Sequence, residues 1–261
     1  MSPVWLELHL ASGEPLRVTS YGVLAILGAA LACWLCVASA RRGGFPAFDA
    51  FGASVIGIAV GLIGARVLYL AVNASRIREV GWLVYLSQGG LVWYGGLAGG
   101  AAAVLLFLRG YRLDVRAFAD IAAPALAVGH GVGRVGCFLA GCCWGKPTSL
   151  PWGVRFPESP FFQGPAGVSL HPVQLYEAGA ELCLAAIAWR LSGKVRKGGA
   201  FAIWLGGYGV VRLVLELFFR GDDRGVGLFG QPPSVALSTV AILLGVGLWS
   251  RGSLTTEKIA S

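Results

Sequence analysis

Long hydrophobic stretches alternate with short polar segments along the whole chain. A helix needs about 20 apolar residues to cross the hydrocarbon of a bilayer, and seven stretches approach or exceed that length. Their predicted ranges are 18–40, 49–72, 89–109, 117–141, 172–191, 199–220 and 233–250. The pattern predicts an all-α, polytopic membrane protein with seven transmembrane helices in a single domain over residues 1–261.

The composition supports a membrane protein. The 261 residues are 56% hydrophobic and 13% charged, with a mean hydropathy of +0.70, which leaves too few polar side chains to cover a water-soluble globule. The first 17 residues lack the basic start of a secretory signal, and no small-residue cleavage pattern follows the first hydrophobic stretch. That stretch is therefore expected to remain as a helix.

The distribution of basic residues favours an N-out, C-in arrangement, in which an odd number of spans separates the termini. Eleven basic residues would then face the cytoplasm: Arg41, Arg42, Arg109, Arg112, Arg116, Arg190, Lys194, Arg196, Lys197, Arg251 and Lys258. Seven would lie outside: Arg17, Arg76, Arg78, Lys146, Arg155, Arg220 and Arg224. The net charge of +8 is spread over short loops without an aromatic-interleaved basic patch, so no nucleic-acid partner is expected.

The longest segment between spans covers residues 144–171 and is rich in proline, glycine and aromatic residues. Under the N-out arrangement it lies on the outer face. Such a segment suits an interfacial cap that touches lipid head groups, although an ordinary aromatic belt has the same composition.

Ionisable side chains inside the predicted spans fall toward the outer side. They are Arg66, Arg134, Glu177, Arg212, Glu216 and Arg220. Charged groups within a membrane are costly, and they usually mark a functional site. A purely structural pairing of arginines with neighbouring carboxylates is the alternative.

Two helical faces bring such residues together. His130, Arg134 and Cys137 fall at i, i+4 and i+7 in a stretch where four glycines between residues 129 and 136 allow close approach of backbones and lipid head groups. Tyr208, Arg212 and Glu216 follow one another at intervals of four residues, so they share a second helical face. Gathered arginines match the oxygens of a phosphate in bidentate fashion, so the expected ligand is an anionic phospholipid head group.

Two acidic residues are expected to serve helix ends. Asp49 precedes the second span and Asp120 lies near the inner end of the fourth. Carboxylates at helix ends commonly stabilise the helix dipole, so a catalytic role is not assigned to either residue.

Several motifs together resemble the prolipoprotein diacylglyceryl transferase family, and the likeness covers nearly the whole chain. The long motifs are Gly133–Phe138, Trp144–Thr148, Pro151–Val154, Phe156–Pro157 and His171–Glu177. Shorter matches in the same order are Tyr21–Gly22, Gly64–Arg66, Gly89–Gly90, Tyr94–Gly96, and Tyr208 with Arg212, Glu216 and Arg220. The Gly-Arg-x-Gly and His-Pro-x-Gln-Leu-Tyr-Glu motifs are long enough to be specific.

The resemblance implies an enzyme of the bacterial plasma (inner) membrane with its active site towards the outer leaflet. It would transfer the diacylglyceryl group of phosphatidylglycerol to the lipobox cysteine in a prolipoprotein signal peptide, forming a thioether and releasing glycerol phosphate. No cofactor or metal is implied, and a monomer is expected. The implied substrate-binding residues are Tyr21, Arg66, Gly133, Arg134, Cys137, Gly145, His171, Gln174, Tyr176, Glu177, Tyr208 and Arg220.

The chain departs from the family pattern inside the implied active site. Cys137 replaces the usual asparagine, Tyr94 replaces the histidine that precedes a Gly-Gly pair, and Cys142-Cys143 replaces a Gly-Glu-like run. A divergent relative that lipidates another thiol is therefore one alternative. A non-enzymatic carrier or transporter of anionic lipid is another, although it should show polar groups through both leaflets.

The reaction requires groups that hold the phosphate, stabilise the leaving group and take the thiol proton. Arg134 and Arg212 are the expected phosphate clamps, and Glu216 is expected to orient Arg212. His130 or Tyr94 is the candidate base, with the histidine favoured because an ordinary imidazole pKa of about 6.5 lies nearer neutrality than a phenol pKa of about 10.

The three cysteines at positions 137, 142 and 143 allow several interpretations. Binding of a metal together with His130 is possible in principle, but the C-x4-C-C spacing matches no familiar zinc framework. Apolar packing and a covalent intermediate on Cys137 are the alternatives, and the resemblance requires no such intermediate.

Overall fold

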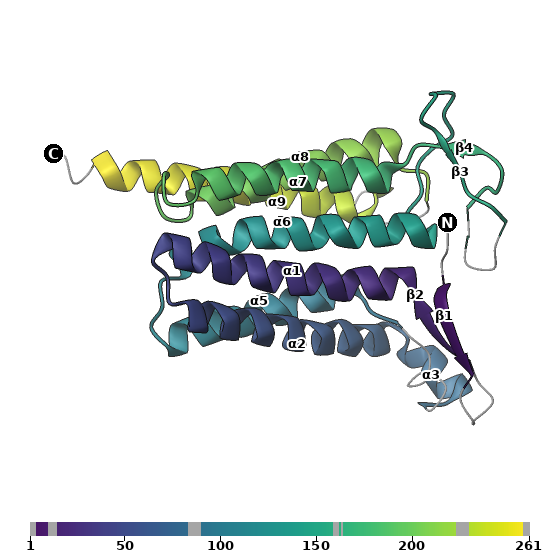
Figure 1. Ribbon diagram of the computed structural model, residues 1–261, viewed down its shortest axis with the longest axis horizontal. Coiled ribbons are helices and arrows are strands. Elements are labelled where there is room, and N and C mark those ends of the chain that lie inside the picture. Colours follow the sequence, from purple (N-terminus) through teal and green to yellow (C-terminus); the bar gives the residue numbers. More distant parts are fainter. Residues whose placement is uncertain are drawn as a thin grey trace. The chain divides into compact units, whose positions relative to one another are not determined.

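The computed structural model describes residues 4–9, 15–82, 90–158, 162, 164–222 and 230–257. The start of the third predicted span at residue 89, part of the 144–171 segment, and Arg224 and Lys258 lie outside these residues. The described chain is mostly helical, which confirms the all-α class (Figure 1).

Among the described residues, five helices are long and apolar enough to cross a membrane. They are α1 (Ser20–Gly43), α2 (Ala47–Val72), α6 (Val115–Ala140), α8 (Gly199–Val214) with its π-helical continuation η1 (Leu215–Phe219), and α9 (Pro233–Glu257). The other two predicted spans correspond to α5 (Trp93–Gly110) and α7 (Val173–Leu191). A short helix, α3 (Ala74–Val80), follows α2.

Two small sheets were not expected from the hydrophobic pattern. Strands β1 (Val4–His9) and β2 (Pro15–Thr19) form an antiparallel hairpin before α1. Strands β3 (Val154–Arg155) and β4 (Ser169–Leu170) pair within the segment between α6 and α7. The strands have 6, 5, 2 and 2 residues, so none of them shows a long alternation of polar and apolar residues.

The described chain divides into two compact units, one of residues 1–35 and 119–261 and the other of residues 36–118. In the second unit, α2 and α5 pack through small residues: a Cβ on Gly95 would overlap the carbonyl oxygen of Gly64. Glycines let helices in a membrane approach this closely. Arg66 and Tyr94, two predicted site residues, belong to this unit.

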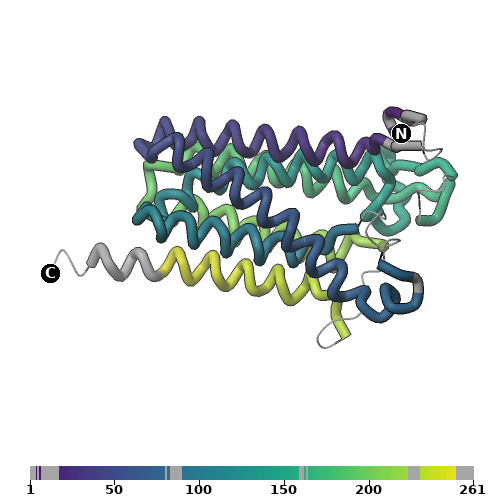
Figure 2. The backbone as a smooth tube through the Cα atoms, turned by 90° about the horizontal axis from the view of Figure 1, so that it is seen from below, coloured from purple at the N-terminus to yellow at the C-terminus, as the bar shows by residue number. Residues whose placement is uncertain are grey.

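The first unit contains α6, α7, α8 and α9 and most of α1. Helices α1 and α6 run side by side in both views, with Gly28 against Gly129 (Figures 1 and 2). Helices α8 and α9 meet where a Cβ on Gly245 would lie 2.7 Å from the backbone nitrogen of Gly206. Small residues thus position α6 and α8, which carry Arg134 and Arg212, two of the four predicted site arginines.

Asp120 serves a helix end, as expected, but the helix is α8 rather than its own α6. Its two carboxylate oxygens accept hydrogen bonds from the backbone N–H groups of Gly198 (2.7 Å) and Phe201 (2.9 Å). A carboxylate at this position satisfies the free donors of the α8 N-terminus and stabilises its dipole. Asp49 lies in the first turn of α2, as expected.

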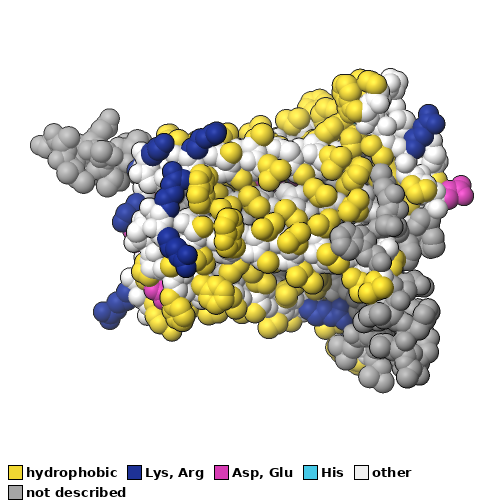
Figure 3. Space-filling model, in the orientation of Figure 1, with side chains coloured by type: hydrophobic (Ala, Val, Ile, Leu, Met, Phe, Trp, Pro, Cys, Tyr) yellow, Lys and Arg dark blue, Asp and Glu magenta, His cyan; other side chains and the backbone are white. Residues whose placement is uncertain are grey.

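Backbone hydrogen bonds join the segment between α6 and α7 to the end of η1. The Lys146 N–H donates to the Phe219 carbonyl (2.7 Å), and the His171 N–H donates to the Lys146 carbonyl (3.0 Å). Hydrophobic side chains cover the middle of α7 and α8, and Lys and Arg side chains gather where α7 ends and α8 begins (Figure 3). The joined segment lies at the other end of these helices.

Candidate functional site

Glu177 on α7 is the centre of a buried ionic cluster in the first unit. Its carboxylate is fully buried and accepts hydrogen bonds from Arg134 Nη2 (2.9 Å to Oε1) and Arg220 Nη2 (2.9 Å to Oε2). Arg212 Nη1 lies 3.3 and 3.2 Å from the two oxygens. Three guanidinium groups, from α6, from α8 and from the residue after η1, therefore converge on one carboxylate. The sequence spacing assigned these residues to separate helices and did not show that they meet.

Glu216 supports the same cluster from η1. Its Oε2 lies 3.2 Å from Arg212 Nη2 and 3.8 Å from Arg220 Nε. The predicted pairing of Glu216 with Arg212 is confirmed. Because an unpaired charge is costly in a low-dielectric interior, two buried carboxylates facing three guanidiniums fix the arginines in place.

Arg134 keeps hydrogen-bonding capacity that the cluster does not use. Its guanidinium donates to Glu177 through Nη2, and its Nη1 approaches only a soft acceptor, the Cys137 sulfur at 3.9 Å. Its Nε is buried and has no hydrogen-bond partner among the described residues. Buried donors are normally satisfied, so this guanidinium has donors available for an anionic oxygen.

His130 lies one helical turn before Arg134 and is held by a second carboxylate. Its Nδ1 is 2.6 Å from Glu181 Oε1, and Trp204 Nε1 donates to the other oxygen of Glu181 at 3.1 Å. A carboxylate only accepts hydrogen bonds, so this contact assigns the imidazole proton to Nδ1. In a neutral imidazole the lone pair is then on the second ring nitrogen, Nε2, which lies 3.9 Å from Glu177 Oε1.

Glu181 and Trp204 were absent from the predicted site. Glu181 is a fully buried carboxylate one turn after Glu177 on α7. The sequence does indicate Glu181, because it is an ionisable residue within a predicted span and lies four residues after Glu177. Such residues usually mark a functional site. Tyr208, which was predicted, packs edge-on against the His130 ring with centroids 5.2 Å apart.

Other predicted residues lie in the first turn of α7 or in the segment that precedes it. Gln174 Nε2 donates to the Cys142 carbonyl at 2.7 Å, and the hydroxyl of Tyr176 accepts from Trp152 Nε1 at 2.7 Å. His171 Nδ1 lies 3.3 Å from the oxygen of the same hydroxyl. A Cβ on Gly145 would overlap the carbonyl of His171. These residues shape the segment rather than join the ionic cluster.

Tyr21 and Gly133 occupy two different environments. The Tyr21 side chain is about half exposed at the start of α1, and its Cα is 3.4 Å from where a Cβ on Gly136 would lie. A Cβ on Gly133 would meet no atom of the described residues within 4 Å. Glycine therefore permits close helix packing at position 136, whereas no described atom lies close to a Cβ at position 133.

Arg66 and Tyr94 are described within the second unit. Arg66 Nη1 donates to the Gly90 carbonyl at 2.9 Å, and its guanidinium carbon lies 5.3 Å from the Tyr69 ring centroid. The Tyr94 side chain is exposed and packs edge-on against Trp93. Each has a defined local environment, and their roles toward a substrate stay predictions.

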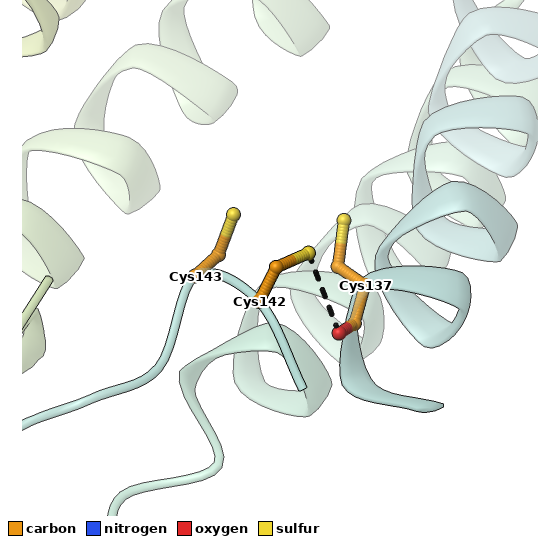
Figure 4. A group of neighbouring side chains, drawn as sticks. All are labelled: Cys137, Cys142 and Cys143. Carbon is orange, nitrogen blue, oxygen red and sulfur yellow. Dashed lines mark hydrogen bonds between the residues drawn. The ribbon is translucent and has the colours of Figure 1, made fainter. Parts of the chain in front are cut away.

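Three thiols lie at the end of α6 and in the turn that follows it. The sulfurs of Cys137, Cys142 and Cys143 lie within 4.8 Å of one another, and His130 does not belong to the group (Figure 4). Cys137 is buried, whereas Cys142 is exposed, so apolar packing does not describe the whole group. Hydrogen bonding to the other two thiols raises the pKa of Cys142 above that of an ordinary thiol.

Comparison with known proteins gives consistent matches over most of the chain. The model of a family described as prolipoprotein diacylglyceryl transferase matches residues 9–251. The phosphatidylglycerol–prolipoprotein diacylglyceryl transferase of Clostridium tetani is 36% identical over 93% of this chain and 95% of its own. A second such transferase from Clostridium perfringens is 30% identical over 93% and 94%, and that of Bordetella bronchiseptica is 34% identical over 90% and 91%.

Proposed function

The chain belongs to the prolipoprotein diacylglyceryl transferase family, and from that premise we propose how the Glu177 cluster performs the family's reaction. The enzyme transfers the diacylglyceryl group of phosphatidylglycerol to the lipobox cysteine of a prolipoprotein. A carbon–sulfur bond forms at the glyceryl carbon, the bond from that carbon to the phosphate oxygen breaks, and glycerol phosphate leaves with the bonding electron pair.

Arg134 binds the phosphate of phosphatidylglycerol. This assignment rests on its buried, unused Nε and on the neighbouring Gly133, where no described atom lies close to a Cβ. The free Nε can donate one hydrogen bond to a phosphate oxygen, and Nη1 can donate another from a different edge of the guanidinium. As negative charge grows on the leaving oxygen, these donors and the nearby guanidinium of Arg212 stabilise it, with Glu177 keeping both groups fixed.

His130 takes the proton of the attacking thiol. Glu181 holds the Nδ1 proton, so the lone pair of Nε2 is directed into the cluster, beside Glu177. This arrangement of a base oriented by a carboxylate is the one that activates nucleophiles in many transferases and hydrolases. It offers a physical reason why a tyrosine suffices at position 94, because the first unit supplies its own imidazole.

The membrane placement completes the proposal. Helices α5 and α7 join the five membrane-spanning candidates to give seven spans, with the N-terminus outside the bacterial plasma membrane. Two observations support this orientation: the ionic cluster lies at the start of α7, and basic side chains gather at the other end, where α7 leads into α8 (Figure 3). The cluster then faces the outer leaflet, and the enzyme acts as a monomer.

The observation that carries the proposal is the convergence of three arginines on Glu177 beside an unused Arg134 donor. The test supplies purified enzyme with phosphatidylglycerol labelled in its acyl chains and a lipobox peptide. We expect the label on the peptide cysteine and release of one glycerol phosphate per transfer, with no label on a matched peptide that carries serine instead. Binding of the lipid without transfer to the cysteine peptide would contradict the proposal and favour another thiol acceptor or a lipid carrier.

A further inference from the structure

The turn after α6 gathers three thiols that the proposed reaction does not use. Cys137 comes from the last turn of α6, and Cys142 and Cys143 come from the residues that follow Gly141 (Figure 4). Their sulfurs all lie within 4.8 Å of one another. The three remaining cysteines, at positions 33, 36 and 183, lie on α1 and α7 and are not part of this group.

The spacing of the sulfurs fits one metal ion. A zinc–sulfur bond is about 2.3 Å long, so two thiolates on one tetrahedral ion lie about 3.8 Å apart. Separations within 4.8 Å need only side-chain rotation to reach that value. No fourth His, Cys, Asp or Glu of the described residues belongs to this group.

The backbone of the turn is fixed, and this preorganises the group. Gln174 Nε2 donates to the Cys142 carbonyl at 2.7 Å, and Arg220 Nη1 donates to the Cys143 carbonyl at 3.3 Å. Cys143 has a φ of 61°, in the left-handed region that a residue other than glycine rarely adopts. Such a conformation persists only where surrounding contacts impose it, and it places Cys143 in the turn beside Cys142 and Cys137 (Figure 4).

We infer that Cys137, Cys142 and Cys143 form a binding site for one thiophilic divalent cation of the Zn2+ or Cd2+ type. Three thiolates are the soft ligands that these ions prefer. A divalent ion with three thiolates has a net charge of −1, and Arg134, whose Nη1 lies 3.9 Å from the Cys137 sulfur, offsets it. Because Cys142 is exposed, a fourth position stays open to water.

The test titrates the reduced, detergent-purified full chain with Co2+, which gives a thiolate-to-metal absorption band in the near ultraviolet, and then displaces it with Zn2+. We expect one Co2+ per chain and loss of the band as one equivalent of Zn2+ binds. Loss of an outer-shell partner weakens metal sites about 10- to 100-fold, so Cys142→Ser and Cys143→Ser, which each lose a ligand, should weaken binding at least about 100-fold.

Cys183→Ser is the matched control, because it removes one exposed thiol from α7 and leaves the group intact. It should bind like the unchanged chain, and circular dichroism should show the same helix content in all variants. Equal binding by the unchanged chain and by Cys142→Ser, or no thiolate band at one equivalent, would overturn the site. So would a disulfide among the three cysteines that forms in place of metal binding when Co2+ is added in air.

Discussion

The negative charge of Glu177 is shared by the three arginines of the site. Placing three arginines in the interior of a membrane protein is costly, and each guanidinium of the cluster reaches an oxygen of this single carboxylate within 3.3 Å. Glu216 supplies a second negative charge to two of them. The arginines are therefore held in place before lipid binds, which is the condition for stabilising charge that develops during a reaction.

The first prediction concerns Arg134. Arg134→Lys keeps the charge but removes the planar fork, so we expect the kcat/KM for phosphatidylglycerol to fall about 100-fold or more, the loss typical of one missing stabilising donor. The measurement is diacylglyceryl transfer by purified protein. Arg155→Lys, an exposed arginine on β3, is the matched control and should keep full activity. Retention of most activity by Arg134→Lys at normal abundance would remove Arg134 from the phosphate site.

The second prediction separates the two candidate bases. His130→Gln removes the imidazole lone pair, so transfer should fall about 100-fold, within the range of general-base catalysis. Glu181→Gln can present its amide oxygen to Nδ1 but carries no charge, so transfer should fall less than with His130→Gln. Unchanged transfer in Glu181→Gln would show that Glu181 does not orient the imidazole.

Tyr94→Phe provides the contrast for this pair of variants. It removes the only hydroxyl that Tyr94 offers, and we expect activity to stay within about twofold of the unchanged enzyme. Loss with Tyr94→Phe and not with His130→Gln would assign the proton to the phenol instead. Full activity in both variants would leave the arginines alone to activate the thiol.

At the scale of single residues, the sequence predicted which residues belong to the site better than it predicted which of them contact one another. The i, i+4, i+7 spacing correctly placed His130, Arg134 and Cys137 on one face of α6. It could not show that Glu177 would receive three arginines, because those contacts join residues 35 to 43 positions apart. Glu181 was missed although its position, one turn after Glu177, carried a readable signal.

At the scale of elements, the π-helix η1 aligns Arg220 with Arg212. Eight residues of an α-helix turn through about 800°, which would leave the two side chains about 80° apart. A π-turn absorbs one extra residue, so eight residues cover about two full turns, as seven do in a regular helix. Arg220 thereby returns to the face that carries Arg212, and both reach Glu177.

The third prediction tests this alignment. Insertion of one alanine after Phe218, a mostly exposed residue of η1, adds a residue that the single π-turn does not absorb and should turn Arg220 about 100° away from Glu177. Misplacement of a catalytic group by about 1 Å can cost about 100-fold, so transfer should fall by at least that factor. Phe218→Ala keeps the residue count and is the control. Equal activity in the insertion and the alanine variant would show that the winding of η1 does not position Arg220.

Hydrophobic length predicted the helices well and their details less well. The observed ends of α2, α6 and α7 fall within two residues of their predicted ranges. The sixth span was expected to be one regular helix over 199–220, but it changes to a π-helix at Leu215. Nothing in a hydrophobic pattern distinguishes these windings, because both leave the same residues apolar.

At the scale of the whole molecule, the charges of the connecting segments bear on orientation. The connection between α7 and α8 carries Lys194, Arg196 and Lys197, and α7 ends near Arg190. The segment between α6 and α7 joins the end of η1 on the cluster side. Basic connections are retained on the cytoplasmic side during insertion, so this asymmetry favours an outer-leaflet site.

The fourth prediction is that the segment between α6 and α7 lies outside the cell. Cysteine introduced at exposed Ser149, in a chain whose exposed Cys142 is replaced by serine, should react with a membrane-impermeant maleimide added to intact cells. Cysteine introduced at exposed Lys194 should react only after the membrane is permeabilised, because the connection from α7 to α8 then faces the cytoplasm. The parent chain without either new cysteine gives the background. Labelling of Lys194→Cys in intact cells, with Ser149→Cys protected, would place the Glu177 cluster at the inner leaflet, where a secreted precursor could not present its lipobox thiol to Arg134.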